Sequence, residues 1–149
     1  MTDMFPVLRV LGILVMIFAS SLALPTAVSW WMQDGDWFVY PLSMAATAFV
    51  GAWLWWSFRV FRRELQPRHG VMLVSLVWLL LPLFAALPLM LAGHHTGRPL
   101  SFTHAYFEAV SGLTTTGSTV MSGLDQLPVS VNVWRTFLQW LGGMGILIL

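Results

Sequence analysis

The chain contains no cysteine and no lysine, and only 9% of its 149 residues are charged. The absence of cysteine excludes a disulfide framework and any metal site built from thiolates. The scarcity of charge excludes an ordinary soluble domain, in which charged residues make up about a quarter of the chain. The sequence also lacks a basic patch with interleaved aromatic residues, so we expect no nucleic-acid partner.

Apolar sequence is what the chain has in abundance, with 58% hydrophobic residues and a mean hydropathy of +0.78. Four apolar runs predict membrane-spanning helices, because a helix needs about 20 apolar residues to cross a bilayer. These runs cover residues 10–24, 37–58, 71–92 and 133–149. We therefore expect an all-α polytopic membrane protein. Residues 1–69 would hold two leading transmembrane helices and a basic loop, and residues 70–149 one helix–pore loop–helix repeat.

The first apolar run has a competing interpretation as a signal peptide cleaved near Ala23 or Ala27. The run is longer than the apolar core of most signal peptides, and Arg9 is the only basic residue before it. These features favour a first transmembrane helix that ends near Pro25. Trp30 and Trp31 would then lie in an interfacial aromatic belt.

The charges predict an orientation. A basic cluster separates the second and third runs, and by the positive-inside rule it is cytoplasmic, together with the N-terminus. Acidic residues after the first run would then lie outside. Alternatively, the cluster binds anionic lipid head groups or a cytoplasmic partner. The cluster comprises Arg59, Arg62, Arg63, Glu64 and Arg68, and the acidic residues are Asp34 and Asp36.

The stretch SFTHAYFEAVSGLTTTGS, residues 101–118, predicts a re-entrant pore loop. Apolar residues at helical spacing indicate a helix over residues 103–113, with Ser101 or Thr103 as its N-cap. Such a helix is about 16 Å long, roughly half the hydrocarbon thickness of a bilayer. Irregular backbone at that depth is tolerated only where protein buries it or where it lines an aqueous path.

The Thr-Thr-Thr-Gly turn after this helix has the chemistry of a potassium site. Backbone carbonyls can replace the water shell of a potassium ion without a full negative charge. Gly117 permits the unusual backbone that this needs, and Thr114, Thr115 and Thr116 can brace it through their hydroxyls. The negative end of the helix dipole also favours a cation there. The simpler alternative is a polar turn between two helices.

Two charged residues near the loop are candidates for its structural support. A carboxylate at membrane depth is costly unless it is paired. We therefore expect Glu108 to hold filter amides or to meet Arg135, as a brace between helices rather than as an ion ligand. Gly142, Gly143 and Gly145 would allow close approach of the last helix.

Other chemistries find little support in the sequence. His94, His95 and His104 could be imagined as metal ligands, but adjacent histidines in an interfacial loop are more commonly solvated. A membrane protease would need a nucleophile motif and an intramembrane base, and the sequence offers neither. We predict that the chain is not an enzyme and uses no organic cofactor.

EAVSGLTTTGSTVMSGLDQLP followed by WRTFLQWLGGMGILIL resembles the first pore repeat of the Trk/Ktr/HKT potassium transporter superfamily, in its TrkH/TrkG branch. The resemblance implies four such repeats around one ion path, a homodimer, and a TrkA-type cytosolic nucleotide-binding partner at a bacterial inner membrane. It implies a filter strand of Thr115, Thr116, Gly117 and Ser118 with Thr114 at its base. Potassium would bind at Thr115, Thr116 and Gly117.

One repeat supplies only one quarter of such a filter. We therefore expect this chain to be the N-terminal fragment of a potassium uptake protein that completes the ring with its remaining repeats. The final apolar run is also shorter than a full span, which suggests that the sequence stops within a helix. The alternatives are a non-conducting truncated product, a structural or assembly subunit of a membrane complex, and a homotetrameric cation channel.

Overall fold

The computed structural model describes residues 4–60, 66–95 and 100–148, and all regular secondary structure in these residues is helical. The prediction of an all-α fold is therefore confirmed. The helices are α1 (Phe5–Ser21), α2 (Ala23–Met32), α3 (Val39–Phe58), α4 (Pro67–His95), α5 (Phe102–Leu113), the short 3-10 helix η2 (Leu124–Gln126) and α6 (Val129–Ile148).

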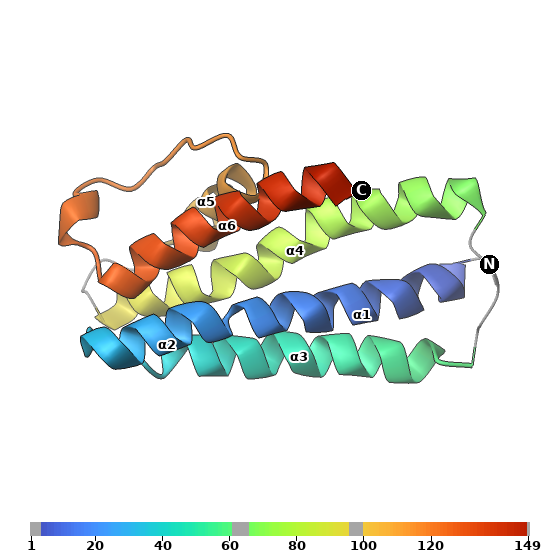
Figure 1. The fold of residues 1–149 in the computed structure, drawn as a ribbon, viewed down its shortest axis with the longest axis horizontal. Helices are drawn as coiled ribbons and strands as arrows, with labels where there is room; N and C mark the ends of the chain where they lie inside the picture. The colour runs from blue at the N-terminus through green and yellow to red at the C-terminus, as the bar shows by residue number, and fades with distance from the viewer. Residues whose placement is uncertain (1–3, 61–65, 96–99, 149) are drawn as a thin grey trace.

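The helices form an elongated bundle with two distinct ends (Figure 1). The start of α1, the end of α3 and the start of α4 lie together at one end, which we call the Arg9 end. The α2–α3 turn, the start of α5 and η2 lie at the opposite end, which we call the Asp34 end. The predicted boundary between residues 69 and 70 falls within the first turn of α4.

The α1–α3 contact depends on two facing glycines. A Cβ atom on Gly12 would lie 2.7 Å from the backbone nitrogen of Trp55, and one on Gly51 would lie 2.9 Å from the carbonyl oxygen of Gly12. Real side chains essentially never approach backbone this closely, so the two helices can cross here only because both residues lack a side chain. Nearer the Arg9 end, the rings of Phe5 and Phe58 stack with centroids 5.4 Å apart.

The first helical segment is longer than the sequence predicts. The expectation that it ends near Pro25 is wrong, because α2 continues to Met32 after a break at Leu22. At the break the Leu22 amide donates to the Ala19 carbonyl, three residues earlier, which makes a tighter turn than that of an α-helix. The chain then continues directly into α2. Proline is tolerated in the first turn of a helix, where its missing N–H is not needed. Pro25 lies in the first turn of α2.

Helix α4 continues through Pro82 and Pro88. Neighbouring helices donate hydrogen bonds to carbonyls that lie three residues before each proline. The Tyr106 hydroxyl of α5 donates to the Leu79 carbonyl, and the Trp134 indole of α6 donates to the Ala85 carbonyl, both at 3.1 Å. The prolines therefore do not end the helix, and α5 and α6 stabilise it where its own ladder is weakened.

Two segments, Phe5–Met32 and Pro67–Ala92, are long and apolar enough to cross a membrane on length and composition. The other two expected spans, α3 and α6, do not meet that composition within the described residues, because polar and amphipathic side chains interrupt them. Large apolar side chains nevertheless face outward along the bundle, as expected of a lipid-facing surface. They include Ile17, Phe49, Trp53, Val71, Leu79 and Trp140.

Candidate functional site: the pore helix and the turn that follows it

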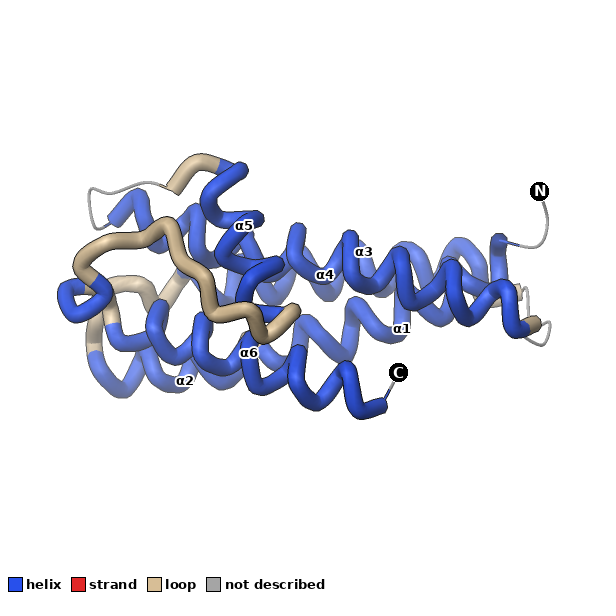
Figure 2. The backbone as a smooth tube through the Cα atoms, turned by 90° about the horizontal axis from the view of Figure 1, so that it is seen from above, coloured by secondary structure: helices blue, strands red, loops and turns tan. Residues whose placement is uncertain are grey.

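Helix α5 enters the bundle from the Asp34 end and stops half-way along it. The Ser101 hydroxyl accepts a hydrogen bond from the His104 amide at 3.3 Å, so Ser101 is the N-cap, as predicted. Ala105, Ala109 and Leu113 form its buried face. After α5 the chain turns and runs back to the Asp34 end as a non-helical segment alongside α6 (Figures 1 and 2). This path is that of a re-entrant loop.

The backbone of the turn has an unusual conformation. Thr115 and Gly117 have positive φ angles of 57° and 74°, which non-glycine residues rarely adopt. The amides of Thr115 and Thr116 donate to the carbonyls of Gly112 and Ser111, both at 2.9 Å, and the Gly117 amide donates to Ser111 at 3.4 Å. Three successive N–H groups therefore point back at the end of α5.

The carbonyl directions follow from these amide bonds. In a trans peptide the N–H and the C=O point in opposite directions, and the described residues contain no cis peptide. The carbonyls of Thr114, Thr115 and Thr116 therefore point away from the end of α5. The segment that carries them, from Thr114 to Val120, is exposed on the surface of this chain.

Ser118 differs from these residues. Its carbonyl accepts a hydrogen bond from the Ser111 hydroxyl at 2.6 Å, so it is engaged within the repeat. Ser111 also supplies the carbonyl that holds the Thr116 and Gly117 amides. Sequence reasoning missed this serine. The available signal was a polar residue one helical turn before the threonines.

Threonine hydroxyls brace the turn from within. Thr114 donates to the Val110 carbonyl at 2.8 Å, and its oxygen also lies 2.8 Å from the Thr116 hydroxyl oxygen. A hydroxyl has only one proton to donate, so Thr116 must be the donor in the second bond. The first and third threonines are thus tied to each other and to α5.

Glu108 joins three parts of the repeat. Its side chain is only 2% exposed and accepts hydrogen bonds through both oxygens. One oxygen accepts from the Thr119 hydroxyl at 2.5 Å and the Val120 amide at 2.7 Å. The other accepts from the Nε and Nη2 atoms of Arg135 at 3.1 and 2.9 Å. Glu108 therefore fixes the returning segment to α5 and both to α6, and it meets the arginine that the sequence suggested.

Of the three α6 glycines, Gly142 is the one that close packing requires. A Cβ atom there would lie 1.8 Å from the Leu113 carbonyl oxygen. At Gly143 the nearest neighbour is the Thr115 methyl group at 3.7 Å, and at Gly145 nothing lies within 4 Å. The last residue of α5, directly before the threonine turn, therefore rests on the bare backbone of α6.

A second polar cluster fixes the outer end of α6, and sequence reasoning did not find it. One oxygen of Asp34 accepts from the Ser130 amide at 3.1 Å and the other from the Ser29 hydroxyl at 2.5 Å. The Tyr40 hydroxyl donates to the Ser130 hydroxyl oxygen at 3.1 Å. Burial alone would raise the pKa of Asp34, but the hydrogen bonds from Ser130 and Ser29 outweigh it and lower the pKa.

Within the described residues, no three histidine, aspartate or glutamate side chains gather into a possible metal cluster. Some candidates from the sequence lie outside the described residues. These are the side chains of His94 and His95, and Arg62, Arg63 and Glu64 of the basic loop.

The family model TrkH, a cation transport protein, matches residues 39–149. The chain belongs to the TrkH family. Its relatives include the Trk system potassium uptake protein TrkH of Halomonas elongata, 43% identical over 96% of this chain. The protein of the same name from Escherichia coli K12 is 38% identical over 95% of this chain. The chain spans 29% of the length of each.

A solved TrkH structure shares the fold. The crystal structure of the potassium transporter TrkH from Vibrio parahaemolyticus superimposes with a TM-score of 0.88 at 37% sequence identity, covering 95% of this chain and 30% of that one. The all-α polytopic membrane fold predicted from the sequence is thereby confirmed. The TrkH relatives are transport proteins.

Proposed function

We propose that this chain takes part in potassium uptake across a bacterial inner membrane and supplies one quarter of a carbonyl-lined selectivity filter. The observation that carries the proposal is the turn after α5. Its amides are bound to the helix end, so the carbonyls of Thr114, Thr115 and Thr116 point together toward an exposed face. Such carbonyls replace the hydration shell of a potassium ion. The relatives whose names call them potassium uptake proteins match 96% and 95% of this chain.

The electrostatics of the turn favour a cation. The C-terminal end of α5 carries the partial negative charge of the helix dipole, and it ends at the turn. We place the ion against Thr115, Thr116 and Gly117, with Thr114 at the base. Ser118 closes the strand, with its carbonyl held by Ser111. Glu108 and Arg135 hold the strand in place without touching the ion.

One strand cannot surround an ion. The carbonyls face one side only, so the ring needs three further strands, which we assign to the remaining repeats of the same transporter. A homodimer and a TrkA-type cytosolic nucleotide-binding subunit complete the proposed system. The proposed cytoplasmic N-terminus is supported by the arginines at the Arg9 end, Arg9, Arg59 and Arg68, opposite the acidic Asp34 end.

The test is a chimera in which residues 1–149 replace the matching segment of Escherichia coli TrkH, expressed in a host that lacks potassium uptake. We expect growth on limiting potassium with the unmodified chimera. Gly117→Ala should lower the potassium-over-sodium preference about tenfold, because a left-handed φ costs an alanine about 1–2 kcal/mol. Potassium and sodium fluxes into the cells measure this preference.

Gly35→Ala is the matched control. Gly35 also has a positive φ, of 90°, and open space around it, but it lies in the α2–α3 turn. An unchanged ion preference in Gly117→Ala, or an equal change in Gly35→Ala, would contradict the filter assignment. Growth supported by residues 1–149 alone would instead favour the homotetrameric channel. No uptake by a well-folded chimera would favour a non-conducting or assembly role.

A further inference from the structure

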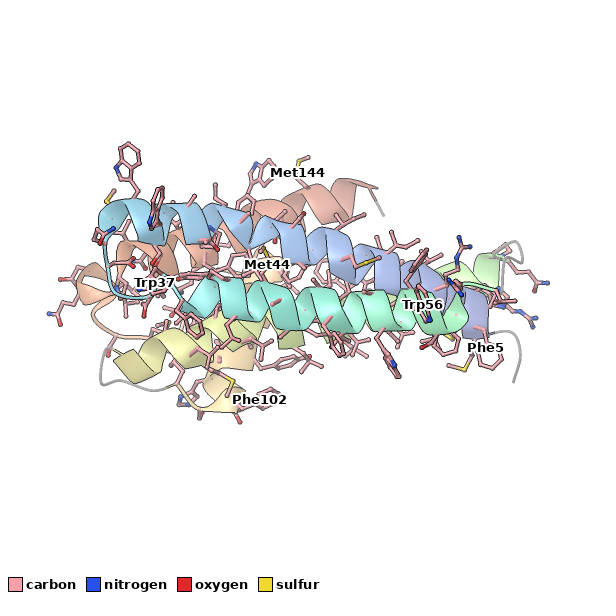
Figure 3. All side chains as sticks on the ribbon, turned by 90° about the horizontal axis from the view of Figure 1, so that it is seen from below. Phe5, Trp37, Met44, Trp56, Phe102 and Met144 are labelled. Carbon is pink, nitrogen blue, oxygen red and sulfur yellow. The ribbon has the colours of Figure 1, made fainter. Side chains whose placement is uncertain are left out.

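A pocket that the pore loop does not use lies at the Arg9 end, between α1 and α3. It has a volume of about 480 Å³ and is lined by Arg9, Trp55, Arg59 and Val60. It lies on the Arg9 side of the Gly12–Gly51 contact. The stacked rings of Phe5 and Phe58 lie in the same part of the bundle. Figure 3 shows Phe5 and Trp56 together at this end, with Trp37 at the other.

The two arginines leave hydrogen-bonding capacity in this pocket. The Nε atom of Arg9 is buried and has no hydrogen-bond partner. The guanidinium of Arg59 lies over the Trp56 ring, 3.9 Å from its centroid, which holds the charge in place but supplies no acceptor. A buried donor without an acceptor is unfavourable, so the pocket favours an incoming acceptor.

No described carboxylate lies near enough to serve as that acceptor. The acidic residues in the described part of the chain are Asp34, Asp36, Glu108 and Asp125. They lie in the α2–α3 turn, on α5 and in η2, all toward the Asp34 end (Figure 1). The pocket therefore presents two positive charges that the described acidic side chains do not neutralise.

The surroundings of the pocket point to a lipid. Arg9 lies in the second turn of α1, and Arg59 directly follows α3, so both lie near the ends of long apolar helices. Arginine and tryptophan at such ends lie at the depth of lipid head groups. Apolar side chains are exposed beside the arginines, with Val60 80% and Trp56 61% exposed. A soluble anion gains nothing from these apolar side chains, whereas an acyl chain is stabilised by them.

We propose that this pocket binds the phosphate group of an anionic phospholipid. The guanidinium forks of Arg9 and Arg59 donate to the phosphate oxygens, as guanidinium groups do in bidentate phosphate recognition. Trp55 and Val60 contact the glycerol and the first part of the acyl chains. The bound lipid would stabilise the α1–α3 pair from the side away from the pore loop. This inference does not depend on the proposed function.

The experiment measures the apparent melting temperature of the purified chain in a neutral detergent. The probes are phosphatidylglycerol, phosphatidylcholine and inorganic phosphate, each titrated separately. We expect saturable stabilisation by phosphatidylglycerol and little effect of the other two. Arg9→Gln and Arg59→Gln should each weaken the apparent affinity for phosphatidylglycerol about tenfold, the effect of losing one charge-assisted hydrogen bond.

Arg68→Gln is the matched control, because Arg68 is exposed at the same end, on α4, and does not line the pocket. It should leave the affinity within about twofold of the unmodified chain, because Arg68 does not line the pocket. Arg9→Lys keeps the charge but not the fork, and should lie between the unmodified chain and Arg9→Gln.

Three results would overturn the proposal. Equal weakening by Arg68→Gln would show diffuse attraction to charge rather than a built site. Stabilisation by inorganic phosphate as strong as by phosphatidylglycerol would assign the pocket to a soluble anion. Equal stabilisation by phosphatidylcholine would remove the selectivity for anionic lipid. If Arg9→Gln has a much lower melting temperature than the unmodified chain in the absence of lipid, its lipid affinity is not informative. Arg59→Gln and Arg9→Lys then test the proposal.

Discussion

The α1–α3 contact and the α5–α6 contact both depend on glycine, but they are held differently. Gly12 and Gly51 bring α1 and α3 to backbone contact, and aromatic stacking supports the pair. Gly142 brings α6 even closer to the end of α5, and this contact also contains the ion pair of the buried Glu108 with Arg135. Two long helices form most of their backbone hydrogen bonds internally. A half-length helix followed by irregular backbone needs side chains to supply hydrogen-bond partners for its backbone groups.

The substitution expected to disrupt the α5–α6 contact most strongly is Gly142→Ala. The new Cβ would lie 1.8 Å from the Leu113 carbonyl oxygen, which belongs to backbone and cannot rotate away. We expect a loss of about 3 kcal/mol or more and displacement of the threonine turn. Thermal unfolding of the purified protein and potassium uptake by the chimera measure the two effects. Gly145→Ala, with open space around it, should be neutral or stabilising. Equal behaviour of the two variants would refute the packing role.

Glu108→Gln tests the ion pair with Arg135, which the α5–α6 contact contains and the α1–α3 contact lacks. The substituted amide is neutral and cannot form an ion pair with Arg135, so a largely buried guanidinium loses its counter-charge, and we expect a loss of about 3 kcal/mol in stability. Asp125→Asn makes the same chemical change at an exposed carboxylate and should cost little. If Glu108→Gln unfolds at the same temperature as the unmodified chain and transports normally, the brace is not needed.

Gly12→Ala should perturb the α1–α3 contact and leave the threonine turn after α5 unchanged. Its Cβ would lie 2.7 Å from the Trp55 backbone nitrogen, and α1 would have to move away from α3 at a cost of about 2 kcal/mol. The potassium-over-sodium preference of the chimera should stay unchanged, unlike that of Gly117→Ala. Gly70→Ala, on α4 with nothing within 4 Å, is the control for stability. A change in ion preference would show that the two contacts are coupled.

The smallest effect is expected where the leading helices meet α6, at Asp34. Its pKa is lowered below the ordinary 3.8, so its contribution to stability is complete above that value. The contribution is lost as the pH falls through the lower pKa of the folded state. The free energies of unfolding of the unmodified chain and of Asp34→Asn, measured at pH 7 and pH 3, should differ by about 1 kcal/mol at pH 7 and converge toward pH 3. A constant difference across this range would contradict the role of the charge.

Local patterns in the sequence were enough to find most of the helices and the loop. Ser101 caps α5 as its position before an apolar periodic run indicates, and Glu108 meets Arg135 as a buried carboxylate requires. The end of the first segment was misplaced at Pro25, because proline is compatible with the first turn of a new helix and the sequence does not show that one begins. The proposed filter residues were predicted as a group from the sequence, but the hydrogen bond between Ser111 and the Ser118 carbonyl was not.

The sequence by itself determined the membrane class, the helical fold, the half-length helix and the family, since each depends on composition or on neighbours within a few residues. Only the tertiary structure decided which of three α6 glycines meets Leu113, and that Asp34 binds Ser130 across 96 positions of the chain. These features depend on how distant helices pack, and helical periodicity fixes which side of a helix is apolar but not which residue of another helix it meets.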